Sequence, residues 1–123
     1  MNKENLQKHV DYCREVLKGT TSSPATFDMQ NFYDDESCET SACFLGWTVF
    51  SFPYYMEDRR EIHESCSWGE TSDDLFWIKY ASDYWKFLFS SDWSNDLEQA
   101  VLRAEYLIEH NKPPENWDYE LRL

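Results

Sequence analysis

The chain has 123 residues, which is the usual size for one domain with a single core. Its formal net charge is −13, and 18% of its residues are aromatic. So many rings exclude a disordered chain, and the negative charge argues against direct binding to nucleic acid or to an anionic membrane, because both would repel it.

The first predicted element is an amphipathic helix over residues 4–18. Its apolar residues recur at spacings of four, three and four, which places them on one helical face: Leu6, Val10, Cys13 and Leu17. Gly19 follows where a C-terminal cap belongs. The Ser, Thr and Pro content of residues 20–26 predicts a loop, and residues 27–37 are expected to pack irregularly against the core.

The second predicted helix starts near Thr40 and runs through Phe50, ended by Pro53. Its residues are apolar on almost all sides, which is typical of a buried helix. Ala42 and Gly46 share a face of it, where another backbone can approach closely. Residues 56–72 are predicted to form a loop with one irregular turn.

Two further helical regions follow. Thr71 and Asp74 have capping-box spacing ahead of residues 75–81, and Ser82 can cap residues 83–89, so this region is one kinked helix or two short ones. Asn95 and Glu98 suit the start of a last helix ending near His110. Its inner stripe is Leu97, Ala100, Val101, Ala104, Leu107 and Ile108.

These elements predict a mainly α fold, a single-domain helical bundle of about four to five helices with an irregular, loop-rich segment. The domain spans residues 1–123, with 118–123 expected to be a flexible tail. The predicted core contains Cys13, Cys43, Leu45, Trp47, Leu97, Val101, Ala104 and Ile108.

The order of several short motifs resembles that of a family of small uncharacterised proteins from phages and bacteria. That family shows FDM-x-x-W followed by CGT-x-x-C-x-x-G-[HW], and the resemblance covers about residues 27–117. The matching residues are Phe27, Asp28, Met29, Cys38, Thr40, Cys43, Gly46 and Trp47, with Phe32 in the usual Trp place. Glu39 replaces the usual Gly, which suggests a different turn there. The resemblance implies a compact α-helical unit and no particular activity.

The cysteines raise the question of a metal site. Cys38 and Cys43, followed by His63 and Cys66, could just supply the four ligands that zinc needs. Cys43, however, lies within a continuous apolar run, where a buried cysteine acts as a small hydrophobe. Residues 1–10 contain no apolar segment of a signal peptide, so we expect a reducing cytoplasm (a host cell's, if phage-encoded), where disulfides are disfavoured. We therefore predict a packing seam, with no metal and no cofactor.

Catalytic patterns are weak in this sequence. His9, His63 and His110 lie on separate elements, and none neighbours a serine or cysteine in a recognisable nucleophile arrangement. The acidic run at residues 34–36 lacks the glycine and terminal glutamate of a calcium-binding loop. No glycine-rich phosphate loop is present. We therefore expect a protein that is not an enzyme.

Acidic and aromatic residues occur side by side in residues 73–93. Rings could supply contact energy there and carboxylates could steer a basic partner. The predicted partner-binding residues are Asp73, Asp74, Trp77, Asp83, Trp85 and Asp92. The surplus of rings also predicts a homodimer, on the basis of Tyr54, Tyr55, Trp68, Trp77, Tyr84 and Trp85.

Three functional hypotheses follow. The first is a binding protein, namely a phage counter-defence inhibitor that blocks a host anti-phage complex of restriction-like or BREX type; DNA mimicry is a variant, against which Lys79, Lys86 and Arg103 interrupt the acidic residues. The second is a small zinc-binding or redox protein that uses Cys38, Cys43, His63 and Cys66. The third is a structural or regulatory module. We favour the first.

Overall fold

The computed structural model describes residues 1–22, 26–27, 41–57, 68–89 and 96–114. Side chains of residues 26–27, 41–42 and 56–57 are outside this description. The fold is mainly helical, as the sequence predicts. Among the described residues, helices of seven or more residues are α1 (Lys3–Lys18), α5 (Trp68–Phe76), α6 (Asp83–Phe89) and α7 (Leu97–His110), while α2 (Thr48–Ser51) and α3 (Pro53–Glu57) are shorter.

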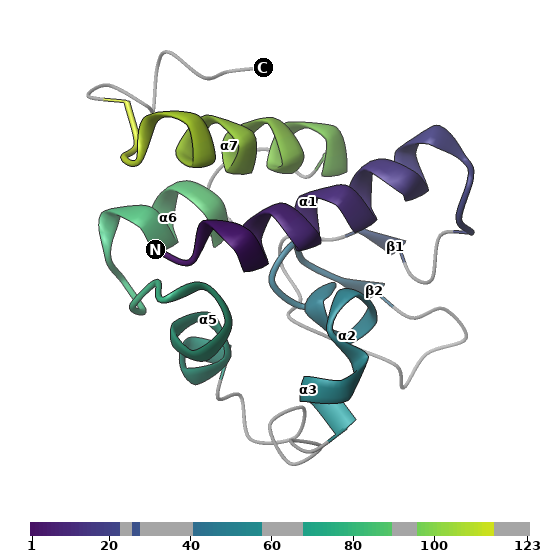
Figure 1. Cartoon of the computed structure of the whole chain (residues 1–123), viewed down its shortest axis with the longest axis horizontal. Coiled ribbons are helices and arrows are strands. Elements are labelled where there is room, and N and C mark those ends of the chain that lie inside the picture. Colours follow the sequence, from purple (N-terminus) through teal and green to yellow (C-terminus); the bar gives the residue numbers. More distant parts are fainter. Residues whose placement is uncertain (23–25, 28–40, 58–67, 90–95, 115–123) are drawn as a thin grey trace.

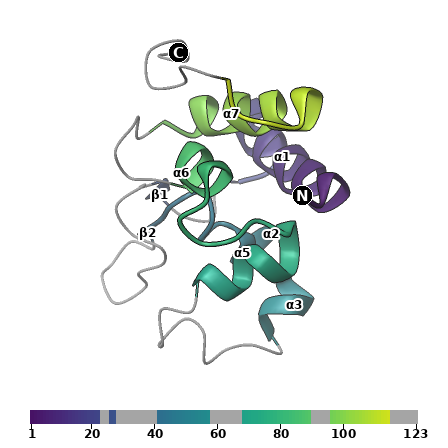
Figure 2. The same ribbon diagram turned by 90° about the vertical axis from the view of Figure 1, so that its left-hand side faces the viewer.

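Helix α1 is the central element of the arrangement. It packs against α7 on one side and against α5 and α2 on the other, and α6 also contacts α7 (Figures 1 and 2). Two short strands, β1 (Thr26–Phe27) and β2 (Ser41–Ala42), pair in parallel, with Phe27 opposite Ala42. Thr26 correspondingly lies opposite Ser41.

Helix α1 forms where its caps and apolar face predict. The Asn2 side chain accepts a hydrogen bond from the backbone of Asn5 at 3.1 Å, and Gly19 closes the helix in the left-handed conformation, with φ of 79°. The buried face consists of Leu6, His9, Val10 and Cys13. The prediction was wrong for Leu17, which is 42% exposed, because the last turns of α1 extend past the end of α7 (Figure 1).

The helix predicted from Thr40 to Phe50 is wrong in its first half. Ser41 and Ala42 pair with β1 instead, and a tight turn follows in which the Trp47 amide donates to the Cys43 carbonyl at 2.9 Å. Strand pairing uses an extended backbone, so helical geometry begins only after Ala42. Pro53 does not end a long helix. It begins α3, because a proline at the first helical position lacks only an N–H that would have no partner within the helix.

The capping box predicted at Thr71 and Asp74 is also wrong. Helix α5 begins at Trp68, inside the predicted loop, and it buries Trp68, Thr71, Ser72, Leu75 and Phe76. Small polar side chains thus contribute to a buried helical face, which an apolar periodicity does not reveal. The helix ends at Phe76, and Ser82 caps α6 by accepting a hydrogen bond from the Trp85 amide at 3.2 Å. The region is therefore two short helices.

Helix α7 matches its prediction closely. Asp96 caps its start by accepting from the Glu98 amide at 2.8 Å, and Asn111 ends it in the left-handed conformation. Asn95, the predicted cap, lies outside the described residues. The predicted inner stripe is buried except for Ile108, which is partly buried. Arg103 is buried as well, and it was not predicted.

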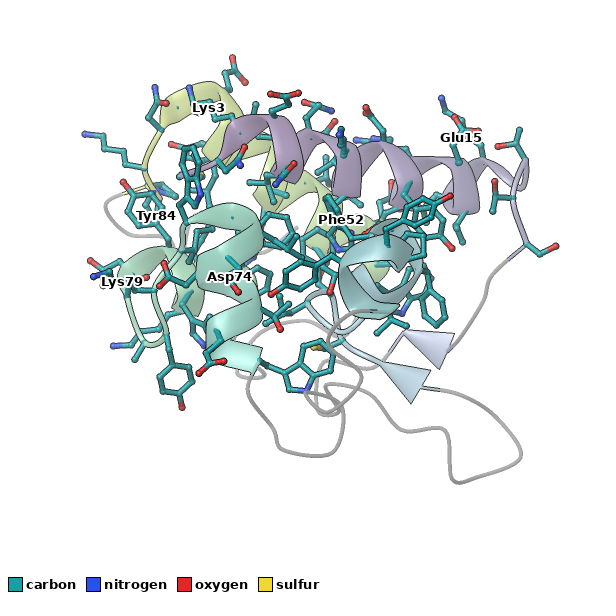
Figure 3. All side chains as sticks on the ribbon, turned by 60° about the horizontal axis from the view of Figure 1, so that its bottom comes forward. Lys3, Glu15, Phe52, Asp74, Lys79 and Tyr84 are labelled. Atoms are coloured by element: carbon teal, nitrogen blue, oxygen red, sulfur yellow. The ribbon has the colours of Figure 1, made fainter. Side chains whose placement is uncertain are left out.

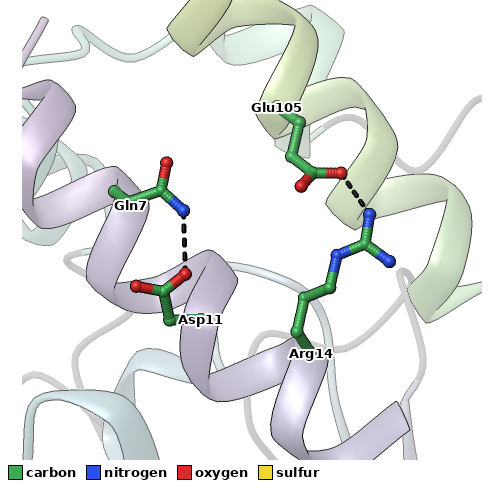
Figure 4. Close-up of polar contacts among 4 residues, drawn as sticks. All are labelled: Gln7, Asp11, Arg14 and Glu105. Atoms are coloured by element: carbon green, nitrogen blue, oxygen red, sulfur yellow. Dashed lines mark hydrogen bonds and ion pairs between the residues drawn. The ribbon is translucent and has the colours of Figure 1, made fainter. Parts of the chain in front are cut away.

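The core encloses all of the predicted residues except Ile108, which is only partly buried. Cys13, Cys43, Leu45, Trp47, Leu97, Val101 and Ala104 are all buried. On the outer side, Arg14 of α1 forms an ion pair with Glu105 of α7, and Gln7 donates to Asp11 within α1 at 2.8 Å (Figure 4). No described helix is long and apolar enough to cross a bilayer.

Candidate functional site

Five of the six predicted partner-binding residues lie on α5, on α6 or on the segment that joins them. Asp73 and Asp74 lie exposed on α5, and Asp83 is the first residue of α6. Trp77 follows α5 directly and is 64% exposed. Asp92 lies outside the described residues. We call residues 77–82 the α5–α6 turn. In Figure 3, Lys79 of this turn and Tyr84 of α6 lie at one end of the molecule, and Asp74 lies between that end and Phe52.

Trp85 differs from the prediction. It is buried at 6% exposure, because it faces inward from α6 and its ring packs edge-to-face against Phe89, with 5.2 Å between ring centroids. Another neighbour is Tyr80, whose ring lies edge-to-face with 4.9 Å between ring centroids and is itself 69% exposed. The sequence analysis did not select Tyr80. Its spacing of three residues from Trp77 was the available signal.

The backbone of the α5–α6 turn is strained at both ends. Trp77 has φ of 56° and Ala81 has φ of 64°, a left-handed conformation that glycine adopts freely and other residues rarely do. Each such residue costs roughly 1–2 kcal/mol relative to the right-handed conformation. Residues in this conformation often cluster at binding sites, where the surrounding structure holds them in place.

Hydrogen bonds within the turn and to α5 hold this strained conformation. The Trp77 amide donates to the Asp73 carbonyl at 3.0 Å, and the Ser72 hydroxyl donates to the Ile78 carbonyl at 2.8 Å. The Ser82 hydroxyl donates to the Lys79 carbonyl at 2.7 Å. The Ile78 side chain is buried, so the turn is also anchored in the core at its second residue.

The start of α1 fixes the turn from the other side. The Asn2 amide donates to the Phe76 carbonyl at 2.6 Å, and the Asn5 side-chain amide donates to the Leu75 carbonyl at 2.8 Å. These carbonyls belong to the last turn of α5, where no partner exists within the helix. The N-terminal segment therefore determines the position at which Trp77 leaves α5.

The Tyr80 side chain is also held in place, although it is exposed. A Cβ atom on Gly69 of α5 would lie only 3.2 Å from the Tyr80 Cβ, so this part of Tyr80 rests closely on the α5 backbone. Its ring lies against Trp85, as described above. An ordered, exposed ring loses little conformational entropy when a partner covers it.

The charge around the turn is negative. Carboxylates at Glu70, Asp73, Asp74 and Asp83 are exposed, against the exposed ammonium groups of Lys79 and Lys86, which leaves a formal excess of two negative charges. Asp74 accepts a hydrogen bond from the Tyr55 hydroxyl at 2.8 Å, so it faces α3. Asp73 and Asp83 are the other two exposed aspartates on the ends of α5 and α6 that flank the turn.

A second polar arrangement is found around His9. Its Nδ1 lies 2.6 Å from the Ser51 hydroxyl oxygen and its Nε2 lies 2.7 Å from the Phe44 carbonyl oxygen. The sequence showed no histidine beside a serine in a recognisable nucleophile arrangement, but the fold brings His9 next to Ser51, which is 42 positions away along the chain. The carbonyl can only accept, so Nε2 carries the proton and donates it, and Nδ1 accepts from the Ser51 hydroxyl. A hydroxyl, a histidine and an orienting group in this order also occur in nucleophilic enzymes.

The surroundings of His9 favour a structural role. The ring is fully buried, with centroid distances of 4.6 Å to the Phe44 ring and 5.8 Å to the Phe76 ring. Burial lowers the pKa of His9 from 6.5 to about 4, although the hydrogen bond to Phe44 opposes this change. A general base works best when its pKa is near the working pH, so this imidazole would be a poor base at neutral pH.

Of the four residues in the zinc hypothesis, the structure describes Cys43. Cys43 is buried, and its Sγ accepts a hydrogen bond from the Gly46 amide at 3.4 Å, which fits the predicted packing seam. Cys38, His63 and Cys66 lie outside the described residues. Within the part of the chain that the structure describes, no group of three or more histidine, cysteine or acidic side chains could hold a metal ion.

Comparisons of this chain with known protein families, with curated proteins and with solved structures find no match. The functional conclusion therefore depends on the site itself. Two exposed rings on a fixed turn, with exposed carboxylates on the flanking helices, can bind another molecule. Among the described residues, this turn has no nucleophile with a base next to it.

Proposed function

We propose that the protein acts by binding a partner protein with a basic surface, and that it does so without turnover. The observation that carries this proposal is the α5–α6 turn, in which Trp77 and Tyr80 are exposed on a backbone that is strained and yet held from several sides. A sequence that needed only a connection between α5 and α6 could place glycine at position 77 and avoid the strain.

The chemistry of the turn suits protein recognition. Tryptophan and tyrosine are enriched among the residues that contribute most to binding energy at protein interfaces. Asp73 and Asp83 would raise the rate of encounter with a basic partner, an effect that the chain's charge of −13 would extend over a longer range. The rings would supply contact energy and the carboxylates would supply steering.

This proposal also has a more specific form. In it, the partner is a component of a host anti-phage complex, of restriction-like or BREX type, and binding blocks that complex in the host cytoplasm. The basic partner surface could be one that otherwise holds DNA, since a strongly acidic protein is attracted to such surfaces.

The test uses affinity capture from bacterial lysate with charge-matched variants. Asp73→Lys combined with Asp83→Lys should lose the captured partner, because two steering carboxylates become repulsive cations. Glu4→Lys combined with Glu109→Lys changes the net charge equally on exposed helix positions outside α5 and α6, and should retain it. Equal capture by both double variants would contradict the proposed site.

The absence of turnover is tested with the purified partner. Inhibition should rise in proportion to added protein and end at a fixed stoichiometry. If one molecule instead inactivates many copies of the partner over time, the protein is an enzyme. A fluorophosphonate, which reacts with activated serines, should leave Ser51 unlabelled, because its partner His9 is a weak base. Stoichiometric zinc in the purified protein would favour the zinc hypothesis.

A further inference from the structure

We infer that the α5–α6 turn recognises arginine side chains of its partner, in preference to lysine. This inference rests on the proposed function, and it specifies the chemistry of the group that the turn contacts. It follows from the combination of exposed rings, nearby carboxylates and a fixed backbone.

The rings favour a guanidinium group over an ammonium group. A guanidinium is planar and weakly hydrated, so it can stack on an aromatic face, whereas an ammonium is compact and keeps its water. Trp77 and Tyr80 are 64% and 69% exposed, so both rings offer surface to such a group. Tryptophan is the strongest aromatic partner for a cation, followed by tyrosine and phenylalanine.

The carboxylates complete the recognition of a planar, forked cation. Asp73 lies one helical turn before Trp77, whose amide donates to the Asp73 carbonyl, and Asp83 follows the turn at the start of α6. A carboxylate can accept two parallel hydrogen bonds from one guanidinium, which an ammonium cannot match. Lys79 lies within the turn and opposes any cation, but it opposes lysine and arginine equally. The preference between them therefore arises from shape and stacking.

Charge also favours an arginine-bearing partner at the turn over a second copy of the chain or an uncharged surface. A second copy of the chain would bring another charge of −13 to the same surface, and an uncharged apolar surface would leave the carboxylates without compensation. The protein itself contains the proposed contact in buried form, because the Arg103 guanidinium lies 4.9 Å from the centre of the Phe87 ring while Nη1 donates to the Phe87 carbonyl at 3.0 Å.

The experiment is a titration of the purified, ¹⁵N-labelled protein with short peptides. The N–H signals of the tryptophan indole groups are monitored by NMR at each step. One peptide carries arginines separated by Gly-Ser, the second carries lysines at the same positions, and the third carries citrulline, which keeps the shape of arginine without its charge. The indole signal of Trp77 is identified by its loss in Trp77→Gly. That variant should fold, since glycine adopts φ of 56° without strain.

The arginine peptide should bind about threefold to tenfold more tightly than the lysine peptide and should shift the Trp77 indole signal. Trp77→Gly should remove this preference while keeping weak, salt-dependent binding of both cationic peptides. Tyr54→Ala removes an exposed ring from α3 and should keep the preference.

Equal binding of the arginine and lysine peptides would overturn the inference and leave the proposed function intact, because a basic partner could still be steered by charge. Equal binding of the citrulline and arginine peptides would also overturn it, since the cation would then be irrelevant. The proposed function fails on a different measurement, namely unchanged capture after reversal of Asp73 and Asp83.

Discussion

The surroundings of His9 and the α5–α6 turn use aromatic residues in opposite ways. Around His9, the Phe44, Phe52 and Phe76 rings enclose an imidazole, and both of its nitrogens have hydrogen-bond partners. At the turn, two rings face solvent on a backbone in a rare conformation. The first arrangement is what a stable interior requires, and the second costs stability in isolation. The difference indicates which rings support the fold and which are available to a partner.

The largest expected effect is on stability, and it differs between two tryptophans, Trp47 in the core and Trp77 on the turn. Trp47 is fully buried and packs edge-to-face with Tyr12 and Phe50, so Trp47→Ala should lower the free energy of unfolding by about 3–5 kcal/mol. Trp77→Ala should change it by less than about 1 kcal/mol, because an exposed ring contributes little to the core. Urea unfolding followed by circular dichroism measures both. Similar losses for the two variants would contradict the comparison.

The second effect is a pH dependence that belongs to His9. Its pKa is 6.5 when unfolded and about 4 when folded, so between these values the unfolded chain binds a proton that the folded protein excludes. The free energy of unfolding should therefore fall by about 3 kcal/mol as the pH decreases from 6.5 to 4, and this contribution should be constant above pH 6.5.

His9→Gln provides the control for this pH dependence, because glutamine does not titrate. The stability difference between the parent and His9→Gln should narrow as the pH falls through the same window, whereas other titrating groups affect both proteins alike. A difference that stays constant from pH 7 to pH 4 would mean that folding does not lower the pKa of His9, so that the imidazole is charged in the folded protein at pH 4.

The third effect concerns the link between α1 and the turn. Asn5→Ala removes the hydrogen bond to the Leu75 carbonyl and should cost about 1 kcal/mol. Amide hydrogen exchange at Trp77 and Ile78 should increase more than exchange in α7, since only the turn loses its support. A uniform increase along the chain would show that Asn5 stabilises the whole fold and not the turn.

The fourth effect is small and has the opposite sign. Ala81→Gly should stabilise the protein slightly, within about 1 kcal/mol, because relief of the left-handed strain exceeds the entropy that glycine adds to the unfolded chain. Thermal unfolding measures the change. Binding to the captured partner should be retained, since both exposed rings are kept. A clear loss of stability would show that the backbone at position 81 is not strained.

The smallest effect is on association of the protein with itself. The sequence predicts a homodimer from six aromatic residues, but Trp68 and Trp85 are buried within one chain, and only Tyr54 and Trp77 of the six are exposed. The prediction remains, on this narrower basis. Light scattering at tens of micromolar should report twice the mass of the chain, and Tyr54→Ala, on α3 and outside the α5–α6 turn, should halve it. A monomeric parent would contradict the prediction.

Periodicity was a reliable guide for the long helices. The apolar faces of α1 and α7 and the cap at Gly19 all followed from the sequence, because burial of one helical face against a neighbour produces that spacing. The short elements did not follow. The extended backbone at Ala42 depends on pairing with Phe27, a contact between distant parts of the chain that no local pattern encodes.

The candidate site was predictable in composition but not in geometry. Asp73, Trp77 and Asp83 are exposed, as partner-binding residues must be, and their binding role stays a prediction. Trp85 was selected on the same grounds as Trp77, yet it faces the interior. Exposure depends on where α5 ends, and that position depends on hydrogen bonds from Asn2 and Asn5 at the other end of the sequence. A local window cannot contain them.

The rates at which the buried thiols of Cys13 and Cys43 react with a reagent would measure how often the structure around each of them opens. Burial raises the pKa of the Cys13 thiol, and neither thiol is accessible in the folded state, so a reagent can modify them only while the surrounding structure is open. Cys13 lies on α1 and Cys43 lies between β2 and α2. Equal rates of modification, followed by mass spectrometry, would mean that both segments open in one cooperative event. Faster modification of Cys43 would mean that the segment around α2 separates first and that α1 stays packed on α7.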